Sequence, residues 1–335
     1  VQCAFCHMTG FEKNYDPVTD AYSSDWKAMG VSCSQCHGEP VETEKGVMLE
    51  ACKNSKPKDP GKESGEAGTG PRPAASALRP NLAMHNCATC HARREEMTGT
   101  FKAGDNFHDH FRLTLADNPA MYFQDGQALD EVYVYGSYTM SRMHLKGITC
   151  MDCHDVHGAT VKHPVANNVL CMTCHTDPGQ NGATPISPTN HSFHKEGSTG
   201  NSCIECHMPL RTYMARDPRR DHGFTSPDPQ LTKELGVPNA CNSCHQDQTV
   251  DWAIEWMDKW YGEKMESRLA RKRARVIGRA QEQDDEVLPE LLELVAGEEI
   301  DYWRATLVQL LSPWSQREEV QQVLVGFLED ESPLV

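Results

Sequence analysis

The sequence predicts a mainly α-helical protein with much irregular structure, in which a long irregular region precedes an α-solenoid of HEAT-like helical repeats. Two observations support this fold class. The 335-residue chain has 24 Gly, 20 Pro and only 38% apolar residues, so a core made of side chains alone would be thin. From residue 249 onward, by contrast, apolar residues recur at helical spacing.

The irregular region is built on one repeated motif, Cys-x-x-Cys-His. Its seven copies use fourteen of the 15 cysteines. The cysteines are Cys3, Cys6, Cys33, Cys36, Cys87, Cys90, Cys150, Cys153, Cys171, Cys174, Cys203, Cys206, Cys241 and Cys244, and the motif histidines are His7, His37, His91, His154, His175, His207 and His245. Structural zinc, disulfides and thioredoxin-type pairs also use paired cysteines, but none requires the histidine. The pattern is the attachment signature of haem c, with the histidine as the proximal iron ligand.

Seven covalent haems change what the fold needs, because each brings an apolar face against which the chain can pack. We therefore expect a heptahaem c-type cytochrome domain at 1–248, organised by haem packing, and helical repeats at 249–335. Haem c is attached after export, so we expect a periplasmic or extracellular protein. A motif directly after Val1 suggests a truncated N-terminus, and the end of the second repeat suggests a truncated C-terminus.

Each iron also needs a sixth ligand, and the chain has nine spare histidines for this role. They are His85, His108, His110, His144, His157, His163, His191, His194 and His222. We expect most of them to be distal ligands, which would make the haems bis-histidine. His157 is too close to His154 to reach the far face of its own haem and should bind a neighbour. His163 is the weakest candidate, and one of His108 and His110 fits a supporting role.

Two alternatives stay open at this stage. Methionine is the other common distal ligand of haem c, but Met8 and Met208 directly follow motif histidines and cannot reach the opposite face. Cys52 has no attachment motif around it, so it is either a free thiol or half of an intermolecular disulfide.

The regular elements are concentrated after His245. Apolar periodicity predicts helices near 249–261, 264–281, 285–296, 300–311 and 316–329. Arg273 and Arg304 correspond, as do Leu291 and Leu324, and this period of about 31 to 33 residues is typical of HEAT-type repeats. Before the repeats, the alternation at 131–135 predicts a short half-buried strand, and 52–80 reads as a surface loop.

The formal net charge of −16 argues against nucleic acid as a partner, and no apolar run is long enough to span a bilayer. Redox partner proteins or other copies of the chain are the expected partners, and a homopolymer is one arrangement they could form. The stretch 264–279 is basic within this acidic chain. It is either a solvated helix face or a docking strip for an acidic surface.

Several stretches resemble exported multihaem cytochromes c of the doubled-CxxCH type with a helical-repeat tail, distantly similar to the cytochrome c-554 and octahaem reductase group. They are 125–137, 141–144, 191–194, 206–209, 217–222 and 238–241. The resemblance implies electron transfer outside the cytoplasm, with His144, His191, His194 and His222 in the positions of distal ligands. It also implies that another motif can precede the first one seen here. Relatives include both electron conduits and reductases.

Six-coordinate irons have no open position for a substrate, so the histidine count favours electron transfer from haem to haem over bond chemistry, and we assign no catalytic residue. The alternative is a reductase of a small nitrogen or sulfur oxyanion at one five-coordinate haem. A third interpretation makes the helical repeats a scaffold for a separate enzyme.

Overall fold

The computed structural model describes residues 2–43, 46–49, 82–213 and 216–335, and Cys52 and the whole predicted loop at 52–80 lie outside them. By packing, the chain divides into two compact units, Val1–Leu113 and Thr114–Val335. Residues 114–248 thus pack in the same unit as the C-terminal helices. This division concerns packing alone, and the predicted domain limits at 248 and 249 stay a prediction.

The first unit joins short helices to two-stranded ribbons. Its helices are α1 (Gln2–His7), α2 (Cys33–His37), α3 (Leu82–His91) and the 3-10 turn η3 (Phe107–Asp109). The antiparallel pairs are β1 (Met8–Thr9) with β4 (Ala28–Met29), β2 (Tyr15–Asp16) with β3 (Ala21–Tyr22), β5 (Pro40–Thr43) with β6 (Gly46–Leu49), and β7 (Arg94–Glu96) with β8 (Phe111–Leu113). Phe107 and Phe111 are buried, and the Arg94 guanidinium lies 3.8 Å from the centre of the Phe111 ring. This small aromatic core supports the ribbon of β7 and β8.

The haem-motif part of the second unit is as irregular as predicted, and none of its described helices exceeds seven residues. They are α4 (Tyr135–Thr139), α5 (Arg142–Leu145), α6 (Cys150–Cys153), α7 (Val169–His175), α8 (Pro188–Ser192), α9 (Cys203–His207), α10 (Pro229–Leu235) and α11 (Ala240–Cys244), with 3-10 turns η4 (Ala166–Asn168), η5 (Gln180–Gly182) and η6 (Thr199–Asn201). The ribbons are β9 (His154–Asp155) with β10 (Thr160–Val161) and β11 (Leu210–Tyr213) with β12 (Asp217–Arg220).

The predicted strand at 131–135 is wrong. Tyr133 has a φ of 61°, in the left-handed region that an extended strand does not visit, and α4 begins at Tyr135. The alternation of large residues arises because Val132 and Tyr135 are both buried on either side of this turn. A pattern of burial across a turn was thus mistaken for the two faces of a strand.

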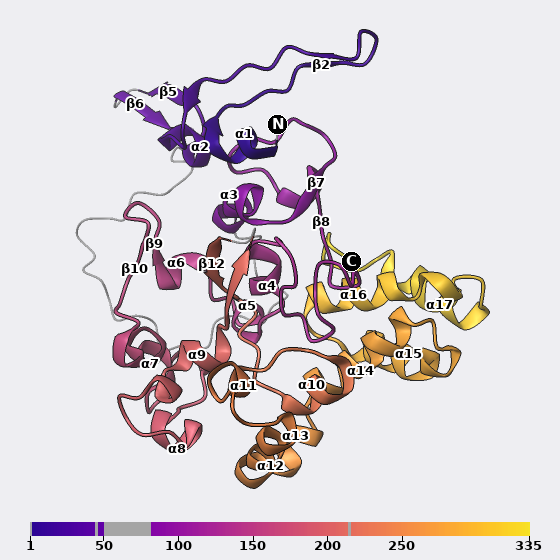
Figure 1. Cartoon of the computed structure of the whole chain (residues 1–335). Helices are drawn as coiled ribbons and strands as arrows, with labels where there is room; N and C mark the ends of the chain where they lie inside the picture. The colour runs from indigo at the N-terminus through magenta and orange to yellow at the C-terminus, as the bar shows by residue number, and fades with distance from the viewer. Residues whose placement is uncertain (1, 44–45, 50–81, 214–215) are drawn as a thin grey trace. The chain divides into compact units, whose positions relative to one another are not determined.

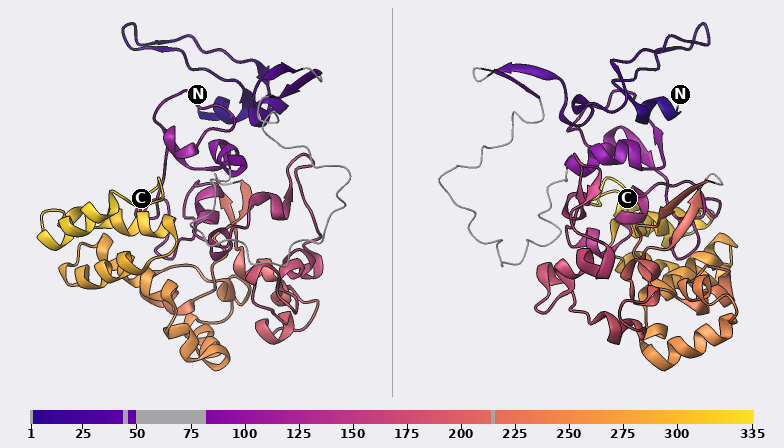
Figure 2. Two further views of the ribbon diagram at one scale, coloured as in Figure 1. Left: turned by 180° about the vertical axis from the view of Figure 1, so that it is seen from behind. Right: turned by 60° about the vertical axis from the view of Figure 1, so that its left-hand side comes forward.

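The C-terminal helices confirm the helical periodicity. They are α12 (Val250–Tyr261), α13 (Glu263–Glu266), α14 (Leu269–Gln281), α15 (Leu288–Gly297), α16 (Asp301–Leu310) and α17 (Glu318–Phe327), with the 3-10 turns η7 (Asp285–Val287) and η8 (Ser312–Trp314). The predicted helix at 264–281 is divided between α13 and α14. Figure 1 and the reverse view in Figure 2 show α14 to α17 stacked one after another. Their assignment to HEAT-type repeats stays a prediction.

The stacked helices and residues 114–140 share one core. The Trp303 indole N–H donates to the carbonyl of Met140 at 3.1 Å, and the Tyr302 hydroxyl donates to the carbonyl of Thr114 at 2.9 Å. Gly126 has a φ of 90°, and a Cβ there would lie 2.6 Å from the Trp303 ring. The segment between the third and fourth haem motifs is therefore fitted closely to the C-terminal helices.

Candidate haem sites

All seven motifs lie on or at the end of short helices, which we call attachment helices: α1, α2, α3, α6, α7, α9 and α11. Residues three apart share one face of a helix, so each pair of cysteines points the same way. In five of these helices the motif histidine is the last residue, and His154 and His245 directly follow the other two. The motif sequence therefore folds locally into the arrangement that covalent attachment needs.

The motif thiols are at least partly accessible. The fourteen motif cysteines form no disulfide with one another, and each is exposed or only half-buried. Burial raises the pKa of the Cys206 thiol to about 11, and burial also raises the pKa of Cys153 and Cys241. No group of three or more His, Cys, Asp or Glu side chains converges on a metal-sized site in the described ranges.

Three spare histidines lie close to motif histidines. The ring centroids of His154 and His222 are 6.4 Å apart, and those of His207 and His191 are 6.0 Å apart, with interplanar angles of 30° and 18°. The rings of His245 and His194 are 6.1 Å apart at 38°.

These separations test whether a haem iron fits between the rings. Metal–imidazole bonds are about 2 Å long and a ring nitrogen lies about 1 Å from the ring centre, so imidazoles on opposite sides of one iron have centroids about 6 Å apart. The three pairs therefore fit bis-histidine coordination.

The hydrogen bonds of these rings support the same role. The Nδ1 atoms of His207 and His222 lie 2.9 Å from the carbonyls of Thr225 and Arg220, and that of His194 lies 2.6 Å from the carbonyl of Ser192. An Nδ1–H held by a carbonyl leaves Nε2 with its lone pair for a metal.

The motif histidine His175 has the same arrangement, since its Nδ1 lies 2.9 Å from the carbonyl of Thr184. Burial also lowers the pKa of His191 and His207, which favours the neutral imidazole that binds iron. The residues present fit haem c.

Two spare histidines of the first unit have ring nitrogens that contact other groups of the protein. His85 is buried, and its Nδ1 accepts the backbone N–H of Phe107 at 3.2 Å, which places the proton of a neutral ring on Nε2. His110 uses both nitrogens, with Nδ1 2.6 Å from the Thr98 hydroxyl and Nε2 3.4 Å from a carboxylate oxygen of Asp105. His108 lies edge-on to His85 at 6.0 Å. Of the pair His108 and His110, His110 fits the supporting role.

The remaining spare histidines are not paired with a motif histidine in the ring contacts above. His144 is largely buried beside Tyr138, burial lowers its pKa, and its Nδ1 has no hydrogen-bond partner among the described residues. His157 lies between β9 and β10 and His163 follows β10, and both are exposed. Their roles as distal ligands stay predictions.

Neighbouring attachment helices contact one another within each unit. In the first unit α1 and α2 both contact α3, and the Asn86 side chain on α3 donates to the carbonyl of Cys36 at 2.9 Å. In the second unit α9 contacts α11. The Cys203 and Cys241 motifs are therefore held side by side.

The backbone carbonyls that hold the ring nitrogens, such as those of Thr184 and Thr225, were not identified from the sequence. Any residue type carries a carbonyl, so no sequence signal could have revealed them.

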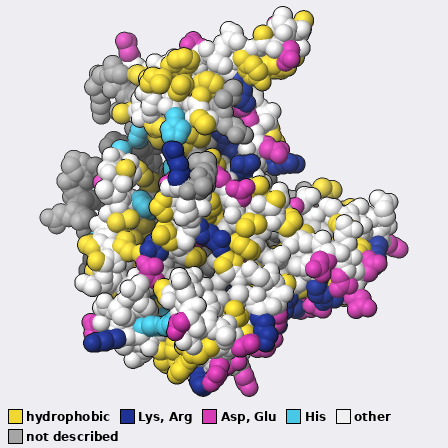
Figure 3. All heavy atoms as spheres, in the orientation of Figure 1, with side chains coloured by type: hydrophobic (Ala, Val, Ile, Leu, Met, Phe, Trp, Pro, Cys, Tyr) yellow, Lys and Arg dark blue, Asp and Glu magenta, His cyan; other side chains and the backbone are white. Residues whose placement is uncertain are grey.

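The basic stretch 264–279 is largely neutralised within the chain. Arg271 pairs with Asp228 and Arg273 with Glu298, each at 2.7 Å, and both pairs are buried. Three more exposed ion pairs join Arg275 to Glu234, Arg279 to Asp284, and Lys272 to Glu293. Figure 3 shows charges of both signs intermixed over the C-terminal helices. These ion pairs favour a helix face that braces the fold over a docking strip.

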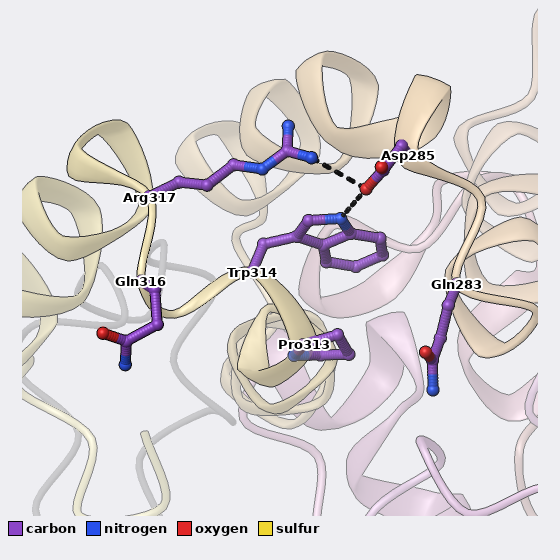
Figure 4. A pocket seen from close by; sticks show the side chains of 6 residues that line it. All are labelled: Gln283, Asp285, Pro313, Trp314, Gln316 and Arg317. Carbon is purple, nitrogen blue, oxygen red and sulfur yellow. Dashed lines mark hydrogen bonds and ion pairs between the residues drawn. The ribbon is translucent and has the colours of Figure 1, made fainter.

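The C-terminal helices also form a pocket of about 390 Å³, lined by Gln283, Asp285, Pro313, Trp314, Gln316 and Arg317. Figure 4 shows that one oxygen of Asp285 accepts hydrogen bonds from both Trp314 and Arg317. The pocket contains no motif residue or spare histidine, so it adds nothing to the haem sites. In the described ranges, no helix is long and apolar enough to cross a bilayer.

Comparison with known proteins agrees with the motif geometry. A family model described as the doubled CXXCH motif matches residues 144–180, and one described as cytochrome c554 and c-prime matches residues 1–38. No curated protein matches the chain. Among solved structures, the crystal structure of the outer cell wall cytochrome OcwA is 16% identical, covers 92% of this chain and 70% of its own, and has a TM-score of 0.48. The motifs, their attachment helices and the two family matches identify the chain as a multihaem cytochrome c.

Proposed function

We propose that the chain is an exported electron-transfer protein that holds seven haem c groups, most of them between two histidines. The observation that carries this proposal is the set of three histidine ring pairs at about 6 Å, His154 with His222, His207 with His191 and His245 with His194. Haem c supplies a reversible one-electron couple when it is bound. The chain's own residues supply attachment, axial ligands and spacing.

Saturated coordination supports electron transfer over reduction of a bound substrate. A histidine on each face leaves no position for a substrate at that iron. Contacts between α9 and α11, and between α3 and both α1 and α2, keep neighbouring attachment sites together. Short separations between sites are what stepwise electron transfer along the chain requires.

The proposed location of the protein, its partners and the role of its C-terminal helices follow from the same features. We place the protein in the periplasm or at the cell exterior, because haem c is attached after export. We expect a redox partner protein or another copy of the chain at the ends of the haem series. We retain 249–335 as HEAT-like repeats, with a bracing role supported by the buried pairs Arg271–Asp228 and Arg273–Glu298.

Electron paramagnetic resonance of the oxidised holoprotein tests the proposal. Bis-histidine coordination should give only low-spin ferric signals, and the reduced protein should not bind carbon monoxide. A substantial high-spin signal together with carbon monoxide binding would instead support the reductase with one five-coordinate haem.

A further inference from the structure

One short segment supplies the spare histidines for two different motifs. His191 faces His207, and His194, three residues later, faces His245. In an uninterrupted helix residues three apart would share a face. Here α8 ends at Ser192, and Phe193 has a φ of 57°, which is unfavourable for a bulky aromatic residue. This turn separates the two histidines.

Helix α12 holds that segment in place. The Trp260 ring stacks on the Phe193 ring with centroids 4.7 Å apart and an interplanar angle of 5°, and it meets the His194 ring edge-on at 6.0 Å. At the other end of the helix, the Trp252 ring lies 4.9 Å from that of His245. A helix assigned by sequence to the repeats therefore contacts both histidines of one candidate haem site.

Tyr261, the last residue of α12, reaches the other site. Its hydroxyl donates to the backbone carbonyl of His191 and lies 3.5 Å from the Nδ1 atom of the same residue. The phenol oxygen can thus accept the Nδ1–H of His191 while it donates its own hydrogen. His194, His207 and His222 use backbone carbonyls for this purpose, whereas His191 uses a side chain.

We infer that Tyr261 is a positioning residue that holds His191 in the Nδ1–H tautomer, with Nε2 directed toward His207. The inference rests on the proposed pairing of His191 with His207 at one haem. An acceptor on Nδ1–H raises the basicity of an axial imidazole, which favours the oxidised state of the iron. Loss of this acceptor should therefore raise one midpoint potential.

The test is Tyr261→Phe in the full-length holoprotein, followed by potentiometric titration and by electron paramagnetic resonance. One haem should shift to a more positive potential, and one low-spin signal should change its g values. Tyr302→Phe is the matched control, because it removes a phenol that donates to the carbonyl of Thr114 and that has no ring contact with a histidine among the described residues. Titration curves of Tyr261→Phe that superimpose on the wild type would overturn the inference, as would an equal shift in Tyr302→Phe.

His191→Ala separates this inference from the proposal beneath it. If His191→Ala converts one low-spin haem to high-spin but Tyr261→Phe changes nothing, the pairing stands and the positioning role fails. If His191→Ala leaves every low-spin signal unchanged, the pairing itself is wrong and the role of Tyr261 falls with it.

Discussion

At the residue scale, the Nδ1 partner distinguishes one histidine from another more clearly than its position in the sequence. His194, His207 and His222 each have Nδ1 against a backbone carbonyl, which orients the ring and leaves Nε2 available. His85 accepts a hydrogen bond at Nδ1 instead, and His110 has partners at both nitrogens. The same residue type therefore divides into ligand-like rings and supporting rings.

His222→Met tests a ligand-like ring. The thioether would replace one imidazole opposite His154, and a methionine ligand raises the potential of a haem relative to histidine. One haem in the potentiometric titration should become more positive, and the reduced spectrum should change for one haem alone.

His110→Met is the matched control, since both nitrogens of His110 are already engaged with Thr98 and Asp105. It should leave the haem potentials as they are in the wild type. A positive shift in His110→Met, or none in His222→Met, would contradict the assignment of these two histidines.

At the scale of elements, α14 shows how burial changes the contribution of an ion pair to the free energy of unfolding. Arg271 makes two hydrogen bonds of 2.7 Å to the Asp228 carboxylate, and the two side chains are only 5% and 7% exposed. Lys272, the next residue, pairs with Glu293 at 2.9 Å, where the side chains are 40% and 71% exposed. Water screens the second pair and not the first.

Alanine substitutions on α14 should therefore differ in cost. Arg271→Ala leaves the Asp228 carboxylate buried without its partner and should lower the free energy of unfolding by about 3–5 kcal/mol. Lys272→Ala removes an exposed pair and should cost less than about 1 kcal/mol. Chemical denaturation followed by far-ultraviolet circular dichroism measures both, and similar losses in the two variants would refute the distinction.

At the scale of the whole molecule, the C-terminal helices contact histidines of the candidate haem sites directly. Trp252 and Trp260 contact His245 and His194, and Tyr261 contacts His191. Tyr302 and Trp303 donate hydrogen bonds to the backbone of the segment between the third and fourth motifs. Removal of the helices should therefore disturb ligation, although the covalent bonds to haem would remain.

A chain ending at residue 248 tests this. The pyridine haemochrome assay should still find seven haems per chain, whereas electron paramagnetic resonance should show altered or high-spin signals. A chain ending at residue 316, which lacks α17 but keeps α12, is the control and should retain the wild-type signals. An unchanged spectrum after truncation at residue 248 would mean that the two regions are independent.

Much of this protein could be predicted because its main signals are local. The Cys-x-x-Cys-His spacing defines attachment within five residues, and apolar periodicity placed the helices after residue 249 near their observed positions. The strand predicted at 131–135 failed because the chain turns at Tyr133, between the buried side chains of Val132 and Tyr135. Local pattern alone does not report that packing.

The sequence by itself determined the cofactor and the number of its attachment motifs, since covalent chemistry needs particular residues at fixed spacing. Only the tertiary structure decided which spare histidine faces which motif, because His222 and His154 are brought together from positions 68 residues apart in the numbering. It also brought the Tyr261 hydroxyl into contact with His191. Such pairings depend on where the chain folds back on itself. Turns, buried ion pairs and aromatic stacks together determine that path.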